Sequence, residues 1–315
     1  MYKKKVESHV IKTSEKSLGK RILMHRELYI MLIPLAVYLA IFWVWPLYGV
    51  QIAFRDYNAA LGFWESPFVG FKHFTRFFNS FYFERTLRNT IGINLYSLLI
   101  SFPLTIILAL MFNEIRSQGF KNFAQIASYA PRFLSIVVVC GMLLTFFSAS
   151  TGMINHILAA IGLERVDFFA FPKYFWHIYV WSGIWQGIGF GTIMYTAAMS
   201  SISKDLYEAA TLDGANRLQK MWYITLPGIQ YVIIVLLIMD LGHMMSLGFE
   251  KVLLLQNNLN LEASEVISTY VYKAGLIEGK YSYTTAIGVF NMAVNLLILS
   301  VSNYTSKKVR GIGLW

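Results

Sequence analysis

Residues 203–227 read SKDLYEAATLDGANRLQKMWYITLP and carry the strongest local structural signals in the chain. Ser203 is a favourable N-cap because its hydroxyl can accept a hydrogen bond from a free backbone N–H of the first helical turn. Asp205 suits that first turn, and residues 204–212 contain nothing that breaks a helix. The first part of this stretch therefore predicts a short helix over residues 204–212.

The chain must turn directly after this helix. Glycine accepts a positive φ at little steric cost, so the pair Asp213-Gly214 predicts a tight turn. Residues 215–223 can then resume as a second short helix, and Pro227 suits the first turn of the next helix, where a missing N–H loses no hydrogen bond. The 203–227 loop therefore predicts two short helices that meet at a glycine.

The sequence on both sides of this loop is apolar. The 315 residues are 56% hydrophobic and only 14% charged, whereas a soluble domain carries about 25% charged residues. Crossing a hydrocarbon core takes roughly 20 apolar residues as a helix. Six segments meet that requirement: 28–47, 90–112, 123–147, 174–199, 228–249 and 284–304. We therefore predict an all-α, polytopic membrane protein with six transmembrane helices.

The distribution of positive charge predicts the orientation of these helices. The net charge of +10 does not indicate nucleic-acid binding, because Lys and Arg lie between apolar spans rather than in one aromatic-flanked patch. Cationic residues favour the cytoplasmic side, and they gather at both termini: Lys3, Lys4, Lys5, Lys12, Lys16, Lys20, Arg21 and Arg26, then Lys307, Lys308 and Arg310. Both termini are expected in the cytoplasm, with loops 113–122 and 200–227 inside and loops 48–89, 148–173 and 250–283 outside. The first outer loop is itself basic, which runs against this topology.

The 203–227 loop resembles the cytoplasmic signature of a known family, the inner-membrane permease subunits of binding-protein-dependent ATP-binding-cassette (ABC) importers of type I. The matching residues are Glu208, Ala209, Ala210, Asp213, Gly214, Ile224, Leu226 and Pro227. The resemblance covers residues 83–308 and departs at Met221, where many relatives carry phenylalanine. Further motifs resemble the oligosaccharide and polysaccharide branch: residues 69–71, 89–90, 248–251, 266–272 and 313–315.

This resemblance implies an assembly and a domain organisation. It implies a bacterial plasma-membrane subunit that works with a second homologous permease, a dimeric cytoplasmic ATP-binding subunit and an extracellular substrate-binding protein. The helix before Gly214 would dock on the ATPase and couple its closure to transport. The chain would comprise a basic cytoplasmic tail (1–27), the first transmembrane helix and an outer loop with an interfacial helix at 71–83 (28–82), the permease domain (83–308) with its coupling loop at 200–227, and a cytoplasmic C-terminal tail (309–315).

The sequence offers no catalytic, cofactor or metal site. It lacks a Gly-x-x-x-x-Gly-Lys-Ser/Thr loop, so ATP and magnesium are expected on the partner ATPase. It also lacks a His-Glu-x-x-His cluster and a recognisable nucleophile arrangement, which argues against a membrane enzyme. Cys140 is the single cysteine and excludes an intrachain disulfide or a cysteine metal cluster.

Polar residues inside the spans are candidates for the substrate path, because such side chains rarely face lipid. In the last span Asn291 and Asn295 share a face with Thr284 and Ser302, and in the second span Asn94 shares one with Ser97, Ser101 and Thr105. These stripes could line a hydroxyl-rich path or make hydrogen bonds between helices, worth roughly 0.6 kcal/mol each.

The fourth and fifth spans add four further candidates. Trp185 and Gln186 could contact a sugar, while the neighbouring glycines 183, 187 and 191 indicate close helix packing. Asp240 and His243 lie about one turn apart, as a satisfied pair or as the proton relay of a secondary transporter, which is the rival function.

Overall fold

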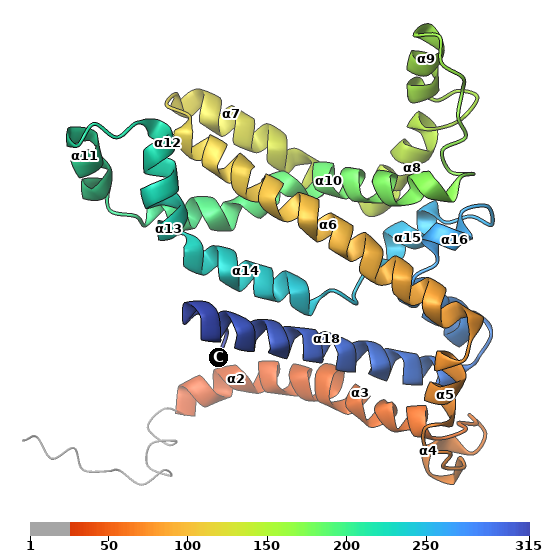
Figure 1. The fold of residues 1–315 in the computed structure, drawn as a ribbon. Coiled ribbons are helices and arrows are strands. Elements are labelled where there is room, and N and C mark those ends of the chain that lie inside the picture. The colour runs from red at the N-terminus through yellow and green to blue at the C-terminus, as the bar shows by residue number, and fades with distance from the viewer. Residues whose placement is uncertain (1–25) are drawn as a thin grey trace, which may run out of the picture. The chain divides into compact units, whose positions relative to one another are not determined.

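The structure is a computed structural model that describes residues 26–315. Over those residues the chain forms α-helices joined by short 3-10 and π-helical segments, and it contains no strand apart from two isolated bridges (Figure 1). The predicted all-α class is therefore confirmed. The basic residues ahead of Arg26, on which the predicted orientation partly rests, lie outside the described residues.

The chain divides into two units, Met1–Gln51 and Ile52–Trp315, which we describe separately. The described part of the first unit contains α2 (Arg26–Leu39), the π-helical η1 (Ala40–Val44), α3 (Trp45–Leu47) and the start of the 3-10 helix η2 (Tyr48–Phe54). The side chains of α2 and α3 are exposed, and an 18-residue window within Arg26–Phe54 has a mean hydropathy of 2.2, as a lipid-facing span requires. This run contains the predicted first span.

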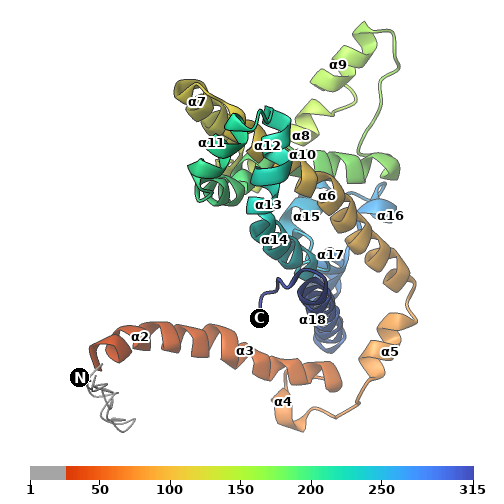
Figure 2. The same ribbon diagram turned by 60° about the vertical axis from the view of Figure 1, so that its left-hand side comes forward.

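The second unit is built on two long helices that lie against each other, α6 (Phe81–Glu114) and α10 (Pro172–Ser200) (Figures 1 and 2). A helix of 29 residues such as α10 is about 43 Å long at 1.5 Å per residue, which exceeds a hydrocarbon core of about 30 Å. Both helices begin earlier than the spans that hydropathy predicts, because each extends past the apolar stretch into the polar loops.

Glycine allows α10 to approach its neighbours closely. A Cβ atom on Gly191 would lie 3.0 Å from Thr105 Cγ2 of α6, so the packing inferred from glycine spacing is confirmed at this position. Gly187 has no such neighbour within 4 Å among the described residues. The tightest approach involves Gly189, where a Cβ would lie 2.2 Å from the backbone oxygen of Ser128.

The third span is broken, so the prediction of one helix over residues 123–147 is wrong. It comprises α7 (Gln118–Tyr129), the 3-10 helix η3 (Ala130–Phe133) and α8 (Ile136–Phe146), with a bend of 94° before α8. Pro131 lies in η3 and removes a backbone donor. The Ser135 hydroxyl then accepts a hydrogen bond from Val138 N at 3.3 Å and starts a new helix.

The fifth span is also shorter than predicted. The π-helical η4 (Met221–Thr225) leads into α13 (Leu226–Gly228), a bend of 60° follows, and α14 (Gln230–Gly242) ends six residues before α15 (Phe249–Leu255) begins. The predicted helix over residues 228–249 is therefore wrong for residues 243–248. In both ribbon views α14 runs beside α18 (Tyr281–Arg310), which forms the last span (Figure 2).

The helices of the structure cover most of the six predicted spans, although the third span is broken and the fifth ends at Gly242. Among the described residues, three helices are long and apolar enough to cross a membrane, and five spans result if each bent pair counts as one. The helix α10 covers the predicted fourth span. The chain is therefore an integral membrane protein by helix length and composition, although its orientation remains a prediction.

Shorter helices cap the end of the second unit that lies away from the 203–227 loop. They are α4 (Gly62–Glu65), α5 (Lys72–Phe78), α9 (Met153–Ala160), α15, α16 (Leu261–Ser264), α17 (Ile267–Tyr272) and the π-helical η5 (Lys273–Ile277). The predicted interfacial helix at 71–83 is split at Asn79 and Ser80 into α5 and the start of α6. Its central Phe77 is 1% exposed and packs against Phe83, so the face expected to meet lipid is partly buried in protein.

A buried ion pair fastens this end to α6. Arg85 pairs with Glu265, and Lys273 Nζ lies 4.0 Å from the second oxygen of the same carboxylate. Burial, reinforced by the Arg85 charge, holds the pKa of Lys273 below its ordinary value.

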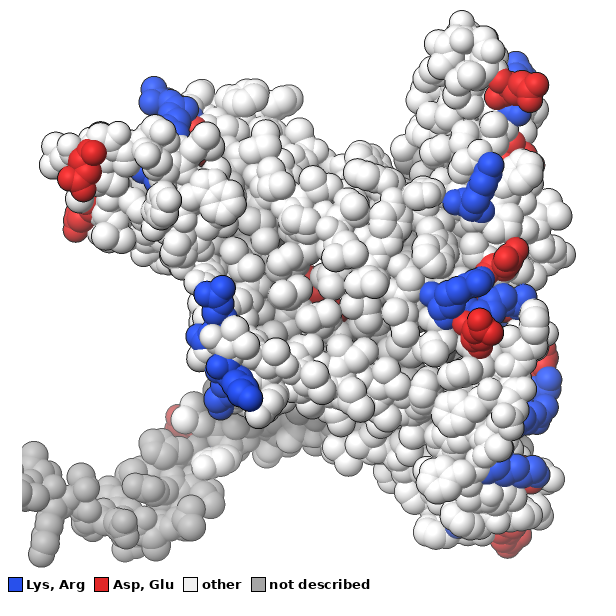
Figure 3. All heavy atoms as spheres, in the orientation of Figure 1, with Lys and Arg blue, Asp and Glu red and all other residues white. Residues whose placement is uncertain are grey.

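Charged side chains in the second unit gather toward the two ends of its long helices, and a broad band that shows only a small acidic patch separates them (Figure 3). This distribution suits a protein whose middle lies in hydrocarbon.

Candidate functional site

The first helix and the turn of the 203–227 loop fold as predicted, whereas the predicted helix over residues 215–223 divides into a short α-helix and the π-helical η4. Its first helix, α11, runs from Lys204 to Leu212, and the Ser203 hydroxyl accepts a hydrogen bond from Asp205 N at 3.2 Å. Its second helix, α12 (Arg217–Lys220), is opened by a capping box in which Asn216 and Gln219 exchange hydrogen bonds of 2.7 and 2.9 Å. This helix starts two residues later than the sequence suggested because the cap residue stands at position 216.

Gly214 makes the turn between the two helices, with φ of +79°. Its N–H donates to Thr211 O at 3.1 Å, and Ala215 N donates to Ala210 O at 2.8 Å, which satisfies the last carbonyls of α11. Two side-chain contacts hold the hairpin together: Lys220 Nζ donates to Thr211 Oγ1 at 2.7 Å, and the hydroxyls of Tyr207 and Thr225 lie 3.0 Å apart.

The outward surface of α11 is apolar in part and has no partner within the described residues. Leu206 is 54% exposed and Leu212 is 90% exposed, while Glu208, Ala209 and Asp213 are also exposed. The remaining predicted residues of the motif behave differently: Ala210 and Ile224 are half-buried, Leu226 packs against the adjoining core, and Pro227 sits in the first turn of α13. The motif thus has an exposed half that can meet another protein and a half that anchors it.

A second candidate site is a polar cavity of about 230 Å³ between α6 and α14. Asn94, Ser97 and Ser101 line it from α6, and Asp240 lines it from α14. His243 and Ser246 join them from the non-helical segment that follows α14. Of the predicted path residues, Asn94 and Asp240 therefore share one cavity.

Asparagine side chains satisfy the backbone of this non-helical segment. Asn94 Nδ2 donates to Met244 O at 2.8 Å, and Asn295 Oδ1 accepts from Met245 N at 2.9 Å while its Nδ2 donates to Ser246 Oγ at 3.0 Å. Irregular backbone at membrane depth requires such partners, because no water supplies them in the hydrocarbon. Sequence reasoning missed the break, although Gly242 and Gly248 at its two ends were a usable signal.

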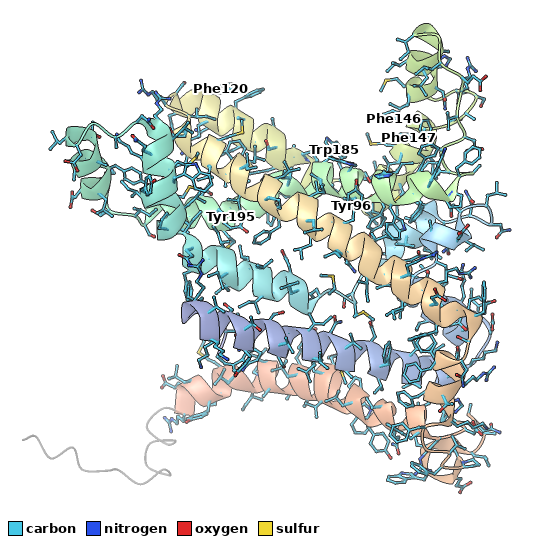
Figure 4. The ribbon with its side chains drawn as sticks, in the orientation of Figure 1. Tyr96, Phe120, Phe146, Phe147, Trp185 and Tyr195 are labelled. Atoms are coloured by element: carbon cyan, nitrogen blue, oxygen red, sulfur yellow. The ribbon has the colours of Figure 1, made fainter. Side chains whose placement is uncertain are left out.

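A third candidate site is an aromatic cavity of about 440 Å³ between α8 and α10. Trp181 and Trp185 line it from α10, and Phe146 and Phe147 line it from the end of α8 (Figure 4). Gln186, next along α10, donates instead to Leu134 O at 3.0 Å, at the junction between η3 and α8. Trp185 therefore faces a cavity, whereas the Gln186 amide completes a broken helix.

The hydrogen bonds of two further predicted residues differ from what their spacing suggested. Asn291 Oδ1 is buried and accepts no hydrogen bond from the described residues. His243 Nδ1 lies 2.8 Å from Met239 O, and no hydrogen bond joins its ring to Asp240 within the described part of the chain. The described residues also contain no cluster of His, Cys, Asp and Glu that could hold a metal ion.

Comparison with known proteins identifies the family. Residues 101–311 match the family described as binding-protein-dependent transport system inner membrane component. The chain belongs to this family. The matched region of this permease includes the whole 203–227 loop and both Asn291 and Asn295, whereas Asn94 lies outside it.

Curated relatives of this permease include a named transport-system permease. It is 42% identical over 288 residues to Protein LplB of Bacillus subtilis (strain 168), covering 91% of each chain. It is 41% identical over 304 residues to the polygalacturonan/rhamnogalacturonan transport system permease protein YteP of the same organism, covering 96% of this chain and 95% of that one.

Solved structures of ABC transporters contain chains that are similar to this permease in fold and sequence. The permease is similar to a chain of a bacterial ABC transporter involved in the import of the acidic polysaccharide alginate, with a TM-score of 0.87 and 42% identity over 94% of this chain and all of that one. It is similar to a chain of the alginate transporter in complex with an alginate pentasaccharide-bound periplasmic protein, with a TM-score of 0.88. The chain is thus a transport permease of the binding-protein-dependent family with the type I fold, as its resemblance implied.

Proposed function

We propose that this permease forms one half of the path for an oligosaccharide in an ATP-driven importer of the bacterial plasma membrane. It would pair with a second homologous permease and receive sugar from an extracellular substrate-binding protein. A dimeric cytoplasmic ATPase would bind ATP and magnesium, and both termini of the permease would lie on that cytoplasmic side. The likeness to a transporter solved with a sugar-bound periplasmic protein supports this assembly.

The observation that carries the proposal is the exposed face of α11. Leu212 is 90% exposed and ends the helix α11. The N-cap and the C-terminal turn of this helix find their hydrogen-bond partners within the 203–227 loop. Exposed apolar side chains on an ordered helix can dock in a groove of a partner protein. We assign that surface to the ATPase, with Glu208, Ala209, Asp213 and Gly214 at the contact.

The path itself is assigned to the aromatic cavity and the polar cavity. Trp185 and its aromatic neighbours offer planar apolar surfaces, and Asp240 with the hydroxyls of Ser97 and Ser101 offers groups that can exchange hydrogen bonds with a sugar. Asn94 and Asn295 support this path by holding the broken segment beside it.

The rival function, a proton-coupled transporter with Asp240 and His243 as its relay, is not favoured by the geometry. The His243 ring is engaged by a backbone carbonyl rather than by Asp240. The rival also leaves the exposed α11 surface without a role.

The test is Gly214→Val in the purified, membrane-reconstituted importer. Gly214 has open space around its Cβ position, so valine would introduce backbone strain without a clash, at a cost of about 1–3 kcal/mol. The strain falls on the turn that ends α11, so the ATPase should dissociate or hydrolyse ATP without driving sugar uptake. Gly162→Val is the matched control. Gly162 has φ of +83° and equally open surroundings, but its turn lies outside the 203–227 loop.

Charge reversal at the same helix provides a second arm. Glu208→Lys should also uncouple ATP hydrolysis from uptake, because an interface carboxylate tolerates reversal poorly. Glu164→Lys changes an equally exposed carboxylate outside the loop and should be silent. Uptake at the parental rate in both Gly214→Val and Glu208→Lys would exclude α11 as the coupling element.

A further inference from the structure

A cavity of about 750 Å³ lies at the ends of α6 and α10 that are remote from the 203–227 loop. Arg88 and Tyr96 line it from α6, Lys173, Trp176 and His177 line it from α10, and Phe171 precedes α10. We call this cavity the outer pocket. Helix α10 runs from Pro172 at the pocket to Ser200 at the loop, so its 29 residues separate the two by about 40 Å. A volume of this size is within the range of small-molecule sites, about 300–1,000 Å³.

The outer pocket carries more positive than negative charge. Arg88 and Lys173 are both exposed, come from different helices and form no ion pair within the described residues. Glu262 is the single carboxylate in the lining, and the contact of Arg88 Nη2 with this residue is to its backbone oxygen at 3.5 Å. Lys173 Nζ lies 4.8 Å from the centre of the Tyr174 ring. Two cations with one opposing charge favour an anionic ligand.

The aromatic wall of the pocket is held in one orientation. Trp176 Nε1 donates to Ala263 O at 2.8 Å, and its ring lies over Gly92, where a Cβ atom would come within 2.2 Å of Trp176 Cη2. A tryptophan fixed on both sides offers a planar apolar surface without further loss of side-chain entropy. Such a surface suits the apolar face of a sugar ring.

Polar groups complete the pocket and connect it to the aromatic cavity. Tyr96 Oη lies 2.9 Å from His177 Nδ1 and accepts a hydrogen bond from Trp181 Nε1 at 3.2 Å, and His177 lines both cavities. Asn89 also lines the outer pocket and is fully buried. Its Nδ2 donates hydrogen bonds to Glu262 O and Glu265 O, both at 2.9 Å. Its Oδ1 accepts no hydrogen bond from the described residues. The Tyr96 hydroxyl and the His177 ring can exchange hydrogen bonds with the hydroxyl groups of a sugar.

We propose that the outer pocket binds the carboxylate-bearing residues of an acidic oligosaccharide before they enter the aromatic cavity. Arg88 and Lys173 pair with the carboxylate, Trp176 stacks on the sugar ring, and the Tyr96–His177 pair contacts its hydroxyl groups. This inference rests on the proposed function and adds a preference for uronate over neutral sugars. An anionic lipid headgroup shares the charge but does not use the continuous aromatic and hydroxyl-binding surface that leads inward along α10.

The experiment compares two trisaccharides on the full importer reconstituted in nanodiscs. Trigalacturonate and its fully methyl-esterified form share their rings and hydroxyls and differ in charge. Calorimetry should show that the parental importer binds the acid at least about tenfold more tightly than the ester, as expected for charge-assisted hydrogen bonds. The double variant Arg88→Gln/Lys173→Gln should lose this preference and keep its affinity for the ester. Arg165→Gln removes an exposed cation from a turn outside the pocket and should keep the preference.

Four results would overturn the inference. The first three are equal binding of acid and ester, an acid preference that survives in the double variant, and uptake without charge preference. The fourth is an anionic phospholipid that copurifies with the parental protein, is absent from the double variant and is not displaced by trigalacturonate. The single variant Lys173→Gln, at an exposed site, keeps the test valid if the double variant is unstable. ATP-driven uptake of both sugars is measured in parallel. Uptake without charge preference rejects only the outer pocket, whereas no ATP-driven uptake of any oligosaccharide rejects the proposed function.

Discussion

Asn295 and Asn291 lie one turn apart on α18, yet the structure gives them opposite energetic roles. Asn295 makes two hydrogen bonds to the broken segment after α14, to Met245 N and Ser246 Oγ. Asn291 keeps a buried oxygen without a partner in the described residues. Replacing each with leucine should therefore change stability in different ways.

The loss of folding stability in Asn295→Leu can be calculated from the Met245 N–H, which loses its acceptor. Met245 is 2% exposed, so its N–H would lose its only described acceptor and could not reach water. An unsatisfied buried donor costs about 1–3 kcal/mol, and a loss of about 2 kcal/mol changes the folded-to-unfolded ratio by roughly 30-fold. Asn291→Leu instead removes an unpaired polar atom and should leave stability unchanged or raise it.

The assay is thermal unfolding of the two variants in the same detergent, followed by tryptophan fluorescence. We expect a lower apparent Tm for Asn295→Leu and an unchanged or higher one for Asn291→Leu. If Asn291 lines the sugar path, its variant should also transport less sugar at normal abundance. Equal Tm values for the two variants would refute the claim that Asn295 holds the broken segment.

Two further predictions concern the end of the second unit remote from the 203–227 loop and the orientation of the chain. Arg85→Gln should destabilise the protein by about 3 kcal/mol because it leaves the buried Glu265 carboxylate without its main partner. In the same unfolding assay, Arg85→Met/Glu265→Met should recover most of that loss. In a Cys140→Ala background, Lys308→Cys should resist an impermeant thiol reagent in intact cells while Glu278→Cys reacts, and the reverse pattern would overturn the topology.

The 203–227 loop could be predicted nearly to the residue because its signals are local. The N-cap at Ser203, the glycine turn at Gly214 and the proline at position 227 each act on the backbone within a few residues, and the structure places α11 at Lys204–Leu212 as expected. Local signals of this kind need no knowledge of the tertiary fold.

The broken spans could not be predicted in the same way. By hydropathy, residues 228–249 form one apolar segment, but the helix ends at Gly242. It can end there because distant side chains form hydrogen bonds with the backbone beyond Gly242. Asn94 lies 150 residues and Asn295 50 residues from the backbone groups that they bind. A sequence pattern that considers one helix at a time contains no such partner.

These hydrogen bonds also change how polar residues within the spans should be interpreted. Helical spacing made Asn94 and Asn295 candidates for the substrate path, and Gln186 was a candidate for sugar contact within the fourth span, but each exchanges a hydrogen bond with backbone where a helix is broken. An unpaired backbone group in hydrocarbon costs several kcal/mol, so this demand takes precedence over substrate contact. Among the predicted path residues, Trp185 and Asp240 remain free to meet a sugar, and each lines a cavity in the described part of the chain. Substrate contact should therefore be sought first at the aromatic surface of α10 and at the single carboxylate beside the end of α14.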